Sequence, residues 1–310
     1  MRSISPHHHL TPYDQGFFER CTELWLGLSS GHMGADLYQH HEGKRNGKAM
    51  SGVTTWNDHA TSGTFPRMNR NSFLSRVSDI AGIIDEGTPI VEYGPTATTL
   101  QLIEAIRSKS YVPVDSSTGI IEFDKRLLAK AVDCEIRPEI QDFFADANLP
   151  VIGQPALGIL LGPTISNLPG PVPREEPAHE LTRALRNLQR PTPFGGHFLV
   201  SMDSNRDAEE IKKFYNEEQH KLFGVNFLYR LAAEIPTQGF NPDSFEYHPV
   251  WHSHCGLLAH TVRATQSQTF TMGSGSSQIE VAVREGDVFH YNIRSNTDPN
   301  NSRRRRRWLG

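Results

Sequence analysis

The sequence predicts an α/β protein in which a doubly wound parallel sheet is joined to a second, α+β unit. Between residues 72 and 205, short apolar runs alternate with segments of helical periodicity. Strands that are apolar on both sides are typical of a parallel sheet with helices on both faces. From residue 239 to 294, apolar and polar residues alternate instead, which indicates antiparallel strands. A chain of 310 residues is long enough for both units.

Short apolar runs mark the expected strands of the parallel sheet. Each run is too short for a helix and is rich in β-branched or other apolar residues. The expected strands are Thr88–Gly94, Tyr111–Asp115, Ala131–Ile136, Ala156–Gly162 and His197–Asp203. Helices are expected at Ala97–Arg107 and near residues 119–130 and 178–189.

The flanking regions combine helical and irregular segments. Tyr13–Leu28 is predicted to be an amphipathic helix, because its apolar residues recur at helical spacing. The remainder of residues 1–71 shows no sustained period, and Ser29–Gly63 is expected to be a long loop or lid. Asp207–Glu234 is predicted to be one helix, interrupted near Phe223–Gly224.

Composition excludes several classes of protein. A hydrophobic content of 37% excludes a mainly disordered chain. No apolar run is long enough to span a membrane, and Met1–Pro12 lacks the apolar segment of a signal peptide. The three cysteines include no C-x-x-C pair, so neither a disulfide framework nor a zinc ribbon is predicted. We therefore expect a cytoplasmic protein without a membrane partner.

Basic residues are concentrated at the end of the sequence. The formal net charge is −4, and Arg303–Arg307 supply five of the 31 Lys and Arg residues, so the rest of the chain is distinctly acidic. An acidic body offers no broad surface for nucleic acid, and no nucleic-acid partner is expected. Residues 295–310 are predicted to be a basic, solvated tail.

The segment from Pro89 to Leu100 is the most informative for function. It is a strand that ends in Glu92 and Gly94 and leads into a helix. Ligands of open α/β sheets bind outside the carboxyl ends of the strands, where a glycine lets them approach the backbone. Asp115, at the end of the next strand, can accept hydrogen bonds from both hydroxyls of a ribose.

The type of nucleoside ligand follows from what this segment lacks. The dinucleotide fingerprint G-x-G-x-x-G is absent, and Pro95 follows the glycine. A nucleoside without a pyrophosphate therefore fits better than a dinucleotide. S-adenosylmethionine is the obvious candidate.

Several segments, in order and at similar spacing, carry a resemblance to a known family. They are Tyr13–Asp14 with Gly16–Glu19, Ile90–Gly94, Tyr111–Asp115, Leu161–Asn167, Phe214–Asn216 and Phe240–Phe245. With these segments the sequence resembles the histidine Nα-methyltransferases of ergothioneine biosynthesis and the fungal enzymes that N-methylate dimethylallyltryptophan. The resemblance is diffuse but runs through most of the chain.

The resemblance implies a class I methyltransferase with a Rossmann-like sheet and S-adenosylmethionine as cofactor. The cofactor domain would span residues 72–205, and residues 1–71 with 206–294 would form a substrate or lid domain. Cofactor contacts are expected from a strand-end set, to which Cys134 is added as a candidate contact to the adenine: Glu92, Gly94, Thr96, Asp115 and Cys134.

The resemblance also assigns residues to the substrate. Asn167 and Tyr215 would hold the amino and carboxylate groups of an amino acid, and these two with Arg294 form the expected catalytic set. The full expected substrate set is Phe65, Asn167, Tyr215, Tyr291, Asn292 and Arg294. The reaction would be an SN2 displacement at a sulfonium carbon, for which the enzyme aligns an uncharged amine and removes water.

Departures from the family pattern change the expected substrate. The first motif has Pro95–Thr96 where a second glycine is usual, and Leu100 replaces a lysine that contacts the cofactor. Asn292 and Arg294 stand where the family has a glutamate and a serine that bind imidazole. A neutral amide cannot give imidazole the charge-assisted hydrogen bond of a glutamate. We therefore expect N-methylation of an amino acid or amino-acid-derived amine other than histidine, in small-molecule (secondary) metabolism.

Two alternatives remain open at this stage. In the first, the α-amine of the cofactor attacks its own γ-carbon and expels methylthioadenosine, which would give azetidine-2-carboxylate; transfer of the aminocarboxypropyl group to a foreign amine is related. In the second, the departures at Pro95 and Leu100 indicate a catalytically inactive scaffold. The partners expected are a small-molecule substrate and a possible second copy of the chain, as a homodimer.

Histidines near Cys255 have the composition of a metal site. His252, His254, Cys255 and His260 combine imidazole and thiolate groups, which suit zinc. On a strand, however, His252 and His254 share a face while Cys255 points away. No metal is therefore predicted.

Overall fold

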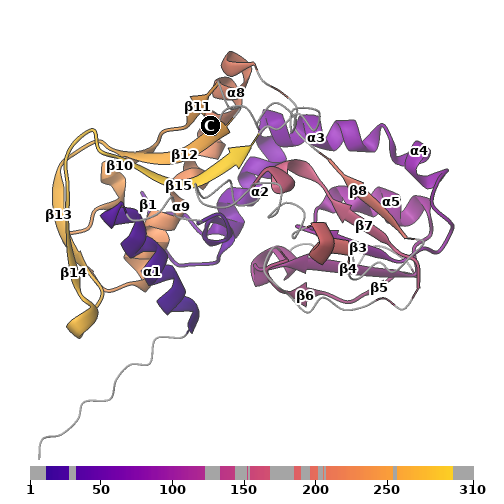
Figure 1. Ribbon diagram of the computed structural model, residues 1–310, viewed down its shortest axis with the longest axis horizontal. Helices are drawn as coiled ribbons and strands as arrows, with labels where there is room; N and C mark the ends of the chain where they lie inside the picture. The colour runs from indigo at the N-terminus through magenta and orange to yellow at the C-terminus, as the bar shows by residue number, and fades with distance from the viewer. Residues whose placement is uncertain are drawn as a thin grey trace, which may run out of the picture.

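The described strands form one parallel sheet and three smaller antiparallel sheets. In the computed structural model, the described residues are 12–27, 33–122, 133–143, 152, 154–167, 185–189, 196–201, 205, 207–253 and 257–295. A parallel sheet lies on the right of Figure 1, and antiparallel strands lie on the left. Helix α2 (Gly52–Ser62) lies between these two parts in the same view.

The parallel sheet confirms the predicted fold class. Its strands are β3 (Ile90–Tyr93), β4 (Ser110–Asp115), β5 (Glu135–Ile136), β6 (Glu139–Ile140), β7 (Leu157–Leu160) and β8 (His197–Val200). They follow the order β5-β4-β3-β7-β8, with β6 also pairing with β4, and each of these pairings is parallel. The strand order reverses between β3 and β7, and such a switch point is where open α/β sheets bind ligands.

Apolar side chains cover both faces of this sheet, as the predicted double winding requires. Successive residues of a strand point to opposite faces. Ile90 belongs to one apolar cluster and Val91 to another. Three short helices cover the Ile90 face: α3 (Thr64–Leu74), α4 (Val77–Ala81) and α5 (Leu100–Ala105). Phe143 and Leu188 pack on the Val91 face.

The predicted antiparallel strands are confirmed between residues 237 and 295. They are β9 (Thr237–Gln238), β10 (Phe245–Tyr247), β11 (Val250–His252), β12 (Leu257–Ala264), β13 (Gln268–Met272), β14 (Ile279–Val283) and β15 (Val288–Ser295). β12 pairs with β10, β11 and β15, while β13 pairs with β14 and β9.

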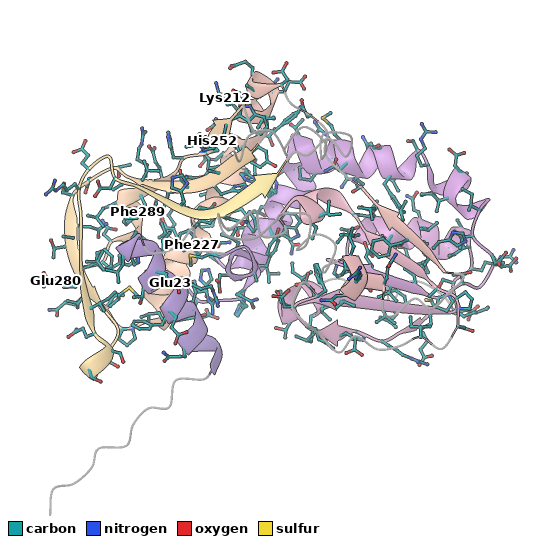
Figure 2. All side chains as sticks on the ribbon, viewed as in Figure 1. Glu23, Lys212, Phe227, His252, Glu280 and Phe289 are labelled. Atoms are coloured by element: carbon teal, nitrogen blue, oxygen red, sulfur yellow. The ribbon has the colours of Figure 1, made fainter. Side chains whose placement is uncertain are left out.

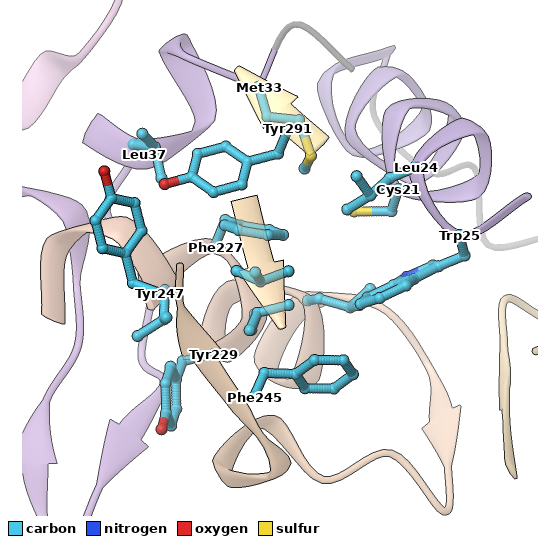
Figure 3. Packing of buried hydrophobic residues seen from close by; sticks show 14 of the residues in the cluster. Cys21, Leu24, Trp25, Met33, Leu37, Phe227, Tyr229, Phe245, Tyr247 and Tyr291 are labelled. Atoms are coloured by element: carbon cyan, nitrogen blue, oxygen red, sulfur yellow. The ribbon is translucent and has the colours of Figure 1, made fainter. Parts of the chain in front are cut away.

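One large core joins the beginning of the chain to its last strands. The predicted N-terminal helix is present as α1 (Pro12–Leu26), and it packs with α9 (Glu218–Glu234) against the antiparallel strands. The ring of Trp25 lies 4.9 Å from that of Phe289 and 5.3 Å from that of Phe245, centroid to centroid. Figure 3 shows Trp25 and Phe245 in this core, and Figure 2 labels Phe227 and Phe289 in the same part of the molecule.

The prediction of a long loop at Ser29–Gly63 is wrong over much of this range. This region contains the 3-10 helix η1 (Ala35–Tyr38), the paired strands β1 (Lys44–Arg45) and β2 (Lys48–Ala49), and helix α2. Helix α2 shows no apolar period because part of its buried face is polar. Its Thr55 is buried and accepts a 2.9 Å hydrogen bond from Asn226 Nδ2 of α9. Helix α3, which begins at Thr64, was likewise missed.

The break in the predicted long helix lies elsewhere. Helix α8 (Ala208–Tyr215) ends before Asn216, and α9 begins at Glu218. Gly224, predicted as the break, lies inside α9. A Cβ atom on Gly224 would lie 2.5 Å from Cδ2 of Tyr247, so this glycine admits a ring of the neighbouring strand.

Some predictions concern residues outside the described ranges. His254, Cys255 and residues 296–310 of the basic tail are among them. Of the described cysteines, both Cys21 and Cys134 are free thiols. Within the described ranges, no helix has the length and hydropathy that crossing a bilayer would require.

Candidate active site

A cavity of about 810 Å³ opens at the carboxyl ends of the parallel strands. Residues that follow β3, β4 and β7 form one side of it: Gly94, Pro95, Thr96, Asp115, Ser116, Gly162 and Thr164. Helices α2, α8 and α9 and strands β12 and β15 supply the other side: Trp56, His59, Tyr215, His220, Phe223, His260, Tyr291 and Asn292. The predicted strand-end site and the antiparallel region thus share one cavity.

Gly94 keeps the strand-end side of the cavity open. Its φ of +69° lies in the left-handed region, which favours glycine. A Cβ atom here would contact Thr164 Oγ1 at 3.7 Å and Phe143 Cζ at 3.9 Å, and both of these residues line the cavity. The backbone turn after β3 is therefore accessible to a ligand.

Glu92 supports this turn from within the fold. It is fully buried and does not line the cavity. Its carboxylate accepts hydrogen bonds from Thr99 Oγ1 at 2.7 Å and from Tyr111 Oη at 2.6 Å. Glu92 thus connects β3, β4 and the 3-10 helix η2 (Ala97–Thr99). The sequence predicts that Glu92 contacts the cofactor, whereas its buried position suits it to hold the turn after β3 in place.

Asp115 lies where the sequence predicts it, at the carboxyl end of β4 and in the cavity wall. The backbone N–H of Ser117 donates a 2.7 Å hydrogen bond to its Oδ1 and fixes the carboxylate. Ser117 Oγ in turn donates to the carbonyl oxygen of Tyr38, on η1. The expected ribose acceptor is therefore coupled to the segment that covers the cavity.

Two lining residues beside the strand ends, among others, were missed by the sequence prediction. Asp142 and Phe143 follow β6 and line the cavity, whereas Cys134, the predicted adenine contact, does not. Burial raises the pKa of the Cys134 thiol. An acidic residue followed by an aromatic one, shortly after β6, the fourth parallel strand in chain order, is the signal that could have identified the pair.

Three buried histidines form part of the opposite wall. His220 Nδ1 lies 3.3 Å from His59 Nε2, and the ring centroids of His220 and His260 are 6.0 Å apart. Burial lowers the pKa of His59 and of His260 to about 4, and burial together with the two other histidines lowers the pKa of His220. All three are neutral near pH 7. Within the described ranges, no group of His, Cys, Asp or Glu could hold a metal ion.

Two tyrosines complete this wall, which we call the imidazole–tyrosine wall: His59, His220, His260, Tyr215 and Tyr291. Tyr247 of β10 does not line the cavity but supports the wall from behind. Tyr247 Oη lies 2.8 Å from His260 Nδ1 in a hydrogen bond. The ring of Tyr215 lies 4.7 Å from that of His220. Figure 3 shows the hydroxyl ends of Tyr247 and Tyr291 directed to the same side of the core. Burial raises the pKa of both phenols, so both hydroxyls stay protonated.

A β-bulge brings two consecutive residues of β15 to the cavity. Asn292 pairs with His260 and His290 pairs with Thr261, so Tyr291 is the extra residue between them. Successive residues of a regular strand face opposite sides, and a bulge redirects a side chain. Tyr291 and Asn292 therefore both line the cavity, as the substrate prediction requires, and the Tyr291 carbonyl accepts a 3.0 Å hydrogen bond from Met33 N.

Other predicted substrate residues have side chains outside the described part of the structure. Asn167 ends the 3-10 helix η3 (Gly162–Asn167), Phe65 lies in α3, and Arg294 lies in β15 opposite Leu258. Of the predicted set, the structure brings Gly94, Thr96, Asp115, Tyr215, Tyr291 and Asn292 to the cavity.

The sequence of residues 66–296 matches the family of histidine-specific, S-adenosylmethionine-dependent methyltransferases. This match covers more than half of the 310 residues. The chain belongs to this family. The family is described as S-adenosylmethionine-dependent methyltransferases, and the parallel sheet of this chain is the class I, Rossmann-like sheet that the sequence predicts.

One curated relative of this chain is distant in sequence. An uncharacterized protein of Sinorhizobium fredii is 27% identical over 173 residues, which are 53% of this chain and 55% of that protein. The chain thus matches about half the length of this curated relative.

Solved structures of methyltransferases are also similar, at low identity. A methyltransferase of Clostridium acetobutylicum has a TM-score of 0.40 and 9% identity, covering 81% of this chain and 84% of its own. The sugar N-methyltransferase KedS8 of Streptoalloteichus has a TM-score of 0.36 and 11% identity, with 80% and 79% covered. The N-methyltransferase NodS of Bradyrhizobium japonicum has a TM-score of 0.33 and 14% identity, with 75% and 90% covered.

The residues of the cavity fit the cofactor of the family. The Gly94 turn leaves its backbone accessible, and the fixed Asp115 carboxylate is an acceptor for hydroxyl groups at the next strand end. Ligand cavities usually span about 300–1,000 Å³, so the observed 810 Å³ has room for a nucleoside and a second small molecule.

Proposed function

We propose that this methyltransferase acts on the amine of an amino acid or an amino-acid-derived small molecule other than histidine, in secondary metabolism. The cofactor domain would comprise residues 72–205, and residues 1–71 with 206–294 would form the substrate domain. One observation carries the proposal: a single cavity is bordered by the Gly94 and Asp115 strand ends on one side and by the imidazole–tyrosine wall on the other.

On the cofactor side, each residue has a role that its position supports. Gly94 and Thr96 would border the methionine part of the cofactor, and Asp115 would accept the ribose hydroxyls. Asp142 and Phe143, which follow the strand that pairs with Asp115, would bind the adenine by a carboxylate acceptor and by ring packing. This assignment replaces Cys134, which lies outside the cavity wall.

On the substrate side, the wall is polar but uncharged. The neutral rings of His59, His220 and His260 offer hydrogen-bond donors and acceptors, while Trp56 and Phe223 offer apolar ring faces. Among the described residues of this wall, none carries a formal charge near pH 7. Such a wall favours an aromatic or other uncharged substrate side chain with polar edges.

Catalysis would consist mainly of alignment and exclusion of water. When bound, the cofactor supplies an electrophilic methyl carbon on a sulfonium. Tyr215 and the neutral imidazoles would hold the amine with its lone pair directed at that carbon, and the surplus N–H proton would pass to solvent when the product leaves. Imidazoles with a pKa of about 4 are weak bases, so His59 and His260 would orient the amine and not deprotonate it.

The identity of the nucleoside product released from the cofactor tests this function. Purified protein is incubated with S-adenosylmethionine, with or without a panel of aromatic amino acids, their decarboxylated amines and histidine, and nucleoside products are identified by mass spectrometry. We expect adenosylhomocysteine only when a non-histidine amine is present. Methylthioadenosine formed without any amine would replace the proposal by the cyclisation reaction, and turnover with histidine alone would overturn the substrate assignment. A Tyr215→Phe variant should keep cofactor binding but lose turnover.

A further inference from the structure

Helix α3 presents one face to the cavity. Six of its residues line the cavity: Pro66, Asn69, Arg70, Ser72, Phe73 and Leu74. Pro66 and Arg70, and Asn69 and Phe73, are each four positions apart, as neighbours on one helical face are. Arg67, on the same helix, is exposed and is not a lining residue. The helix therefore places one guanidinium at the cavity and another in solvent.

Arg70 differs from Arg76, the other arginine that lines the cavity, in its burial and in its partners. Arg76 also lines the cavity, but its side chain is exposed and Nη1 lies 3.1 Å from Asp79 Oδ2 in an ion pair. Arg70 is half-buried, and it forms no ion pair with a described carboxylate. A partly buried guanidinium without a protein carboxylate is suited to an anionic ligand, because removing a charge from water costs free energy unless it is paired.

The surroundings of Arg70 belong to the cofactor side. Helix α3 contacts η2, and the neighbouring lining residues Thr96, Thr98 and Gln101 follow the Gly94 turn. Helix α5 supplies no cation there, since Leu100 packs in the apolar cluster on the sheet. The imidazole–tyrosine wall comes from other elements: α2, α8, α9, β12 and β15.

We propose that Arg70 binds the carboxylate in the methionine part of the cofactor. This inference rests on the proposed use of the strand-end side for S-adenosylmethionine. Arginine matches a carboxylate with two parallel hydrogen bonds, and its fork geometry would set the direction of the methionine chain above the Gly94 turn. Arg70 would then orient the cofactor without contacting the amine.

Calorimetric titration with two nucleosides tests this role. The first is S-adenosylhomocysteine, and the second is its decarboxylated analogue, which differs only in lacking the carboxylate. We expect Arg70→Ala to weaken the binding of S-adenosylhomocysteine about tenfold or more while changing the affinity for the analogue less than about twofold. Arg70→Lys should give an intermediate loss.

Controls separate this role from a change in folding or in the function itself. Arg67→Ala removes a neighbouring exposed guanidinium and should bind both nucleosides as the unaltered protein does. An equal loss for both nucleosides in Arg70→Ala, or no loss for either, would overturn the assignment. Unaltered nucleoside affinity with a raised KM for the amine would assign Arg70 to a substrate carboxylate. Failure of the unaltered protein to bind either nucleoside would instead overturn the proposed function.

Discussion

Arg230 Nη1 donates a 2.8 Å hydrogen bond to Oδ1 of Asp36, and the two side chains are 0% and 2% exposed. Arg20 Nε donates to the other oxygen of Asp36 at 2.7 Å, and Arg230 Nε donates to Glu234 at 2.8 Å. Asp36 lies in η1, whose neighbouring residues line the cavity. This buried ion cluster therefore fixes the cavity wall to helices α1 and α9.

Replacing Asp36 by Ala should destabilise the fold strongly. The substitution leaves the buried guanidinium of Arg230 with less negative charge around it, and breaking a buried pair in this way costs about 3–5 kcal/mol. Urea unfolding followed by tryptophan fluorescence measures the free energy. Asp58→Ala is the matched control, since its pair with Lys48 is about half exposed and should contribute less than about 1 kcal/mol. A loss in Asp36→Ala no larger than in the control would contradict the role of the cluster.

Stability should fall as the pH is lowered from 6.5 toward 4. Burial lowers the pKa of His41, His59 and His260 to about 4 in the fold, from 6.5 when unfolded. Between these values the unfolded chain binds more protons, so the free energy of unfolding decreases with falling pH. Urea titrations at several pH values should show a loss on the order of a few kcal/mol over this window.

A histidine variant isolates this effect from the titration of carboxylates. His260→Gln removes one of the buried imidazoles, and it should give a smaller pH dependence over the same window. His248→Gln, a histidine outside the cavity wall, serves as the control and should leave the slope as it is. Equal slopes in all three proteins would show that the imidazoles of the wall do not determine the pH dependence.

The strands of the parallel sheet were predictable because their signal is local. β3, β4 and β7 are buried on both faces, so each reads as an apolar run, and the carboxyl end of a strand directly indicates where Gly94 and Asp115 meet. Helix α2 gave no such signal. Its buried Thr55 and His59 are polar and find their partners on α9, more than 150 residues later in the chain.

The substrate side of the cavity shows the same limit. The family pattern predicts that both Tyr291 and Asn292 contact the substrate, but a regular strand would direct only one of the two side chains to the cavity. The bulge that turns both inward depends on the pairing of β12 with β15, which no short stretch of sequence encodes. His59 and His220 come together from α2 and α9, and their joint burial is a property of tertiary packing alone.

Replacing Gly224 by Ala should destabilise the protein, against helix propensity. Alanine is the better helix former, so propensity alone predicts a gain of about 1 kcal/mol at this interior position of α9. The new Cβ would instead lie 2.5 Å from Cδ2 of Tyr247 and displace a ring that is hydrogen-bonded to His260. Overpacking of this kind costs about 1–3 kcal/mol. Thermal and urea unfolding give the sign, and an increase in stability would show that the ring yields without cost.

Asp115→Ala should weaken cofactor binding by about 1–3 kcal/mol, as expected when a charge-assisted acceptor is lost. Isothermal titration with S-adenosylhomocysteine measures the change.

Asp115 also accepts a hydrogen bond from Ser117 N, so a displaced loop would contribute to the loss of affinity as well. A cofactor analogue without the two ribose hydroxyls resolves this: its affinity should be weak and nearly equal in both proteins if Asp115 acts through the ribose. Asp85→Ala, an exposed site before β3, should bind the natural nucleoside normally. If Asp115→Ala weakened the binding of both nucleosides equally, Asp115 would act by holding the loop in place, and the ribose would lack its expected acceptor.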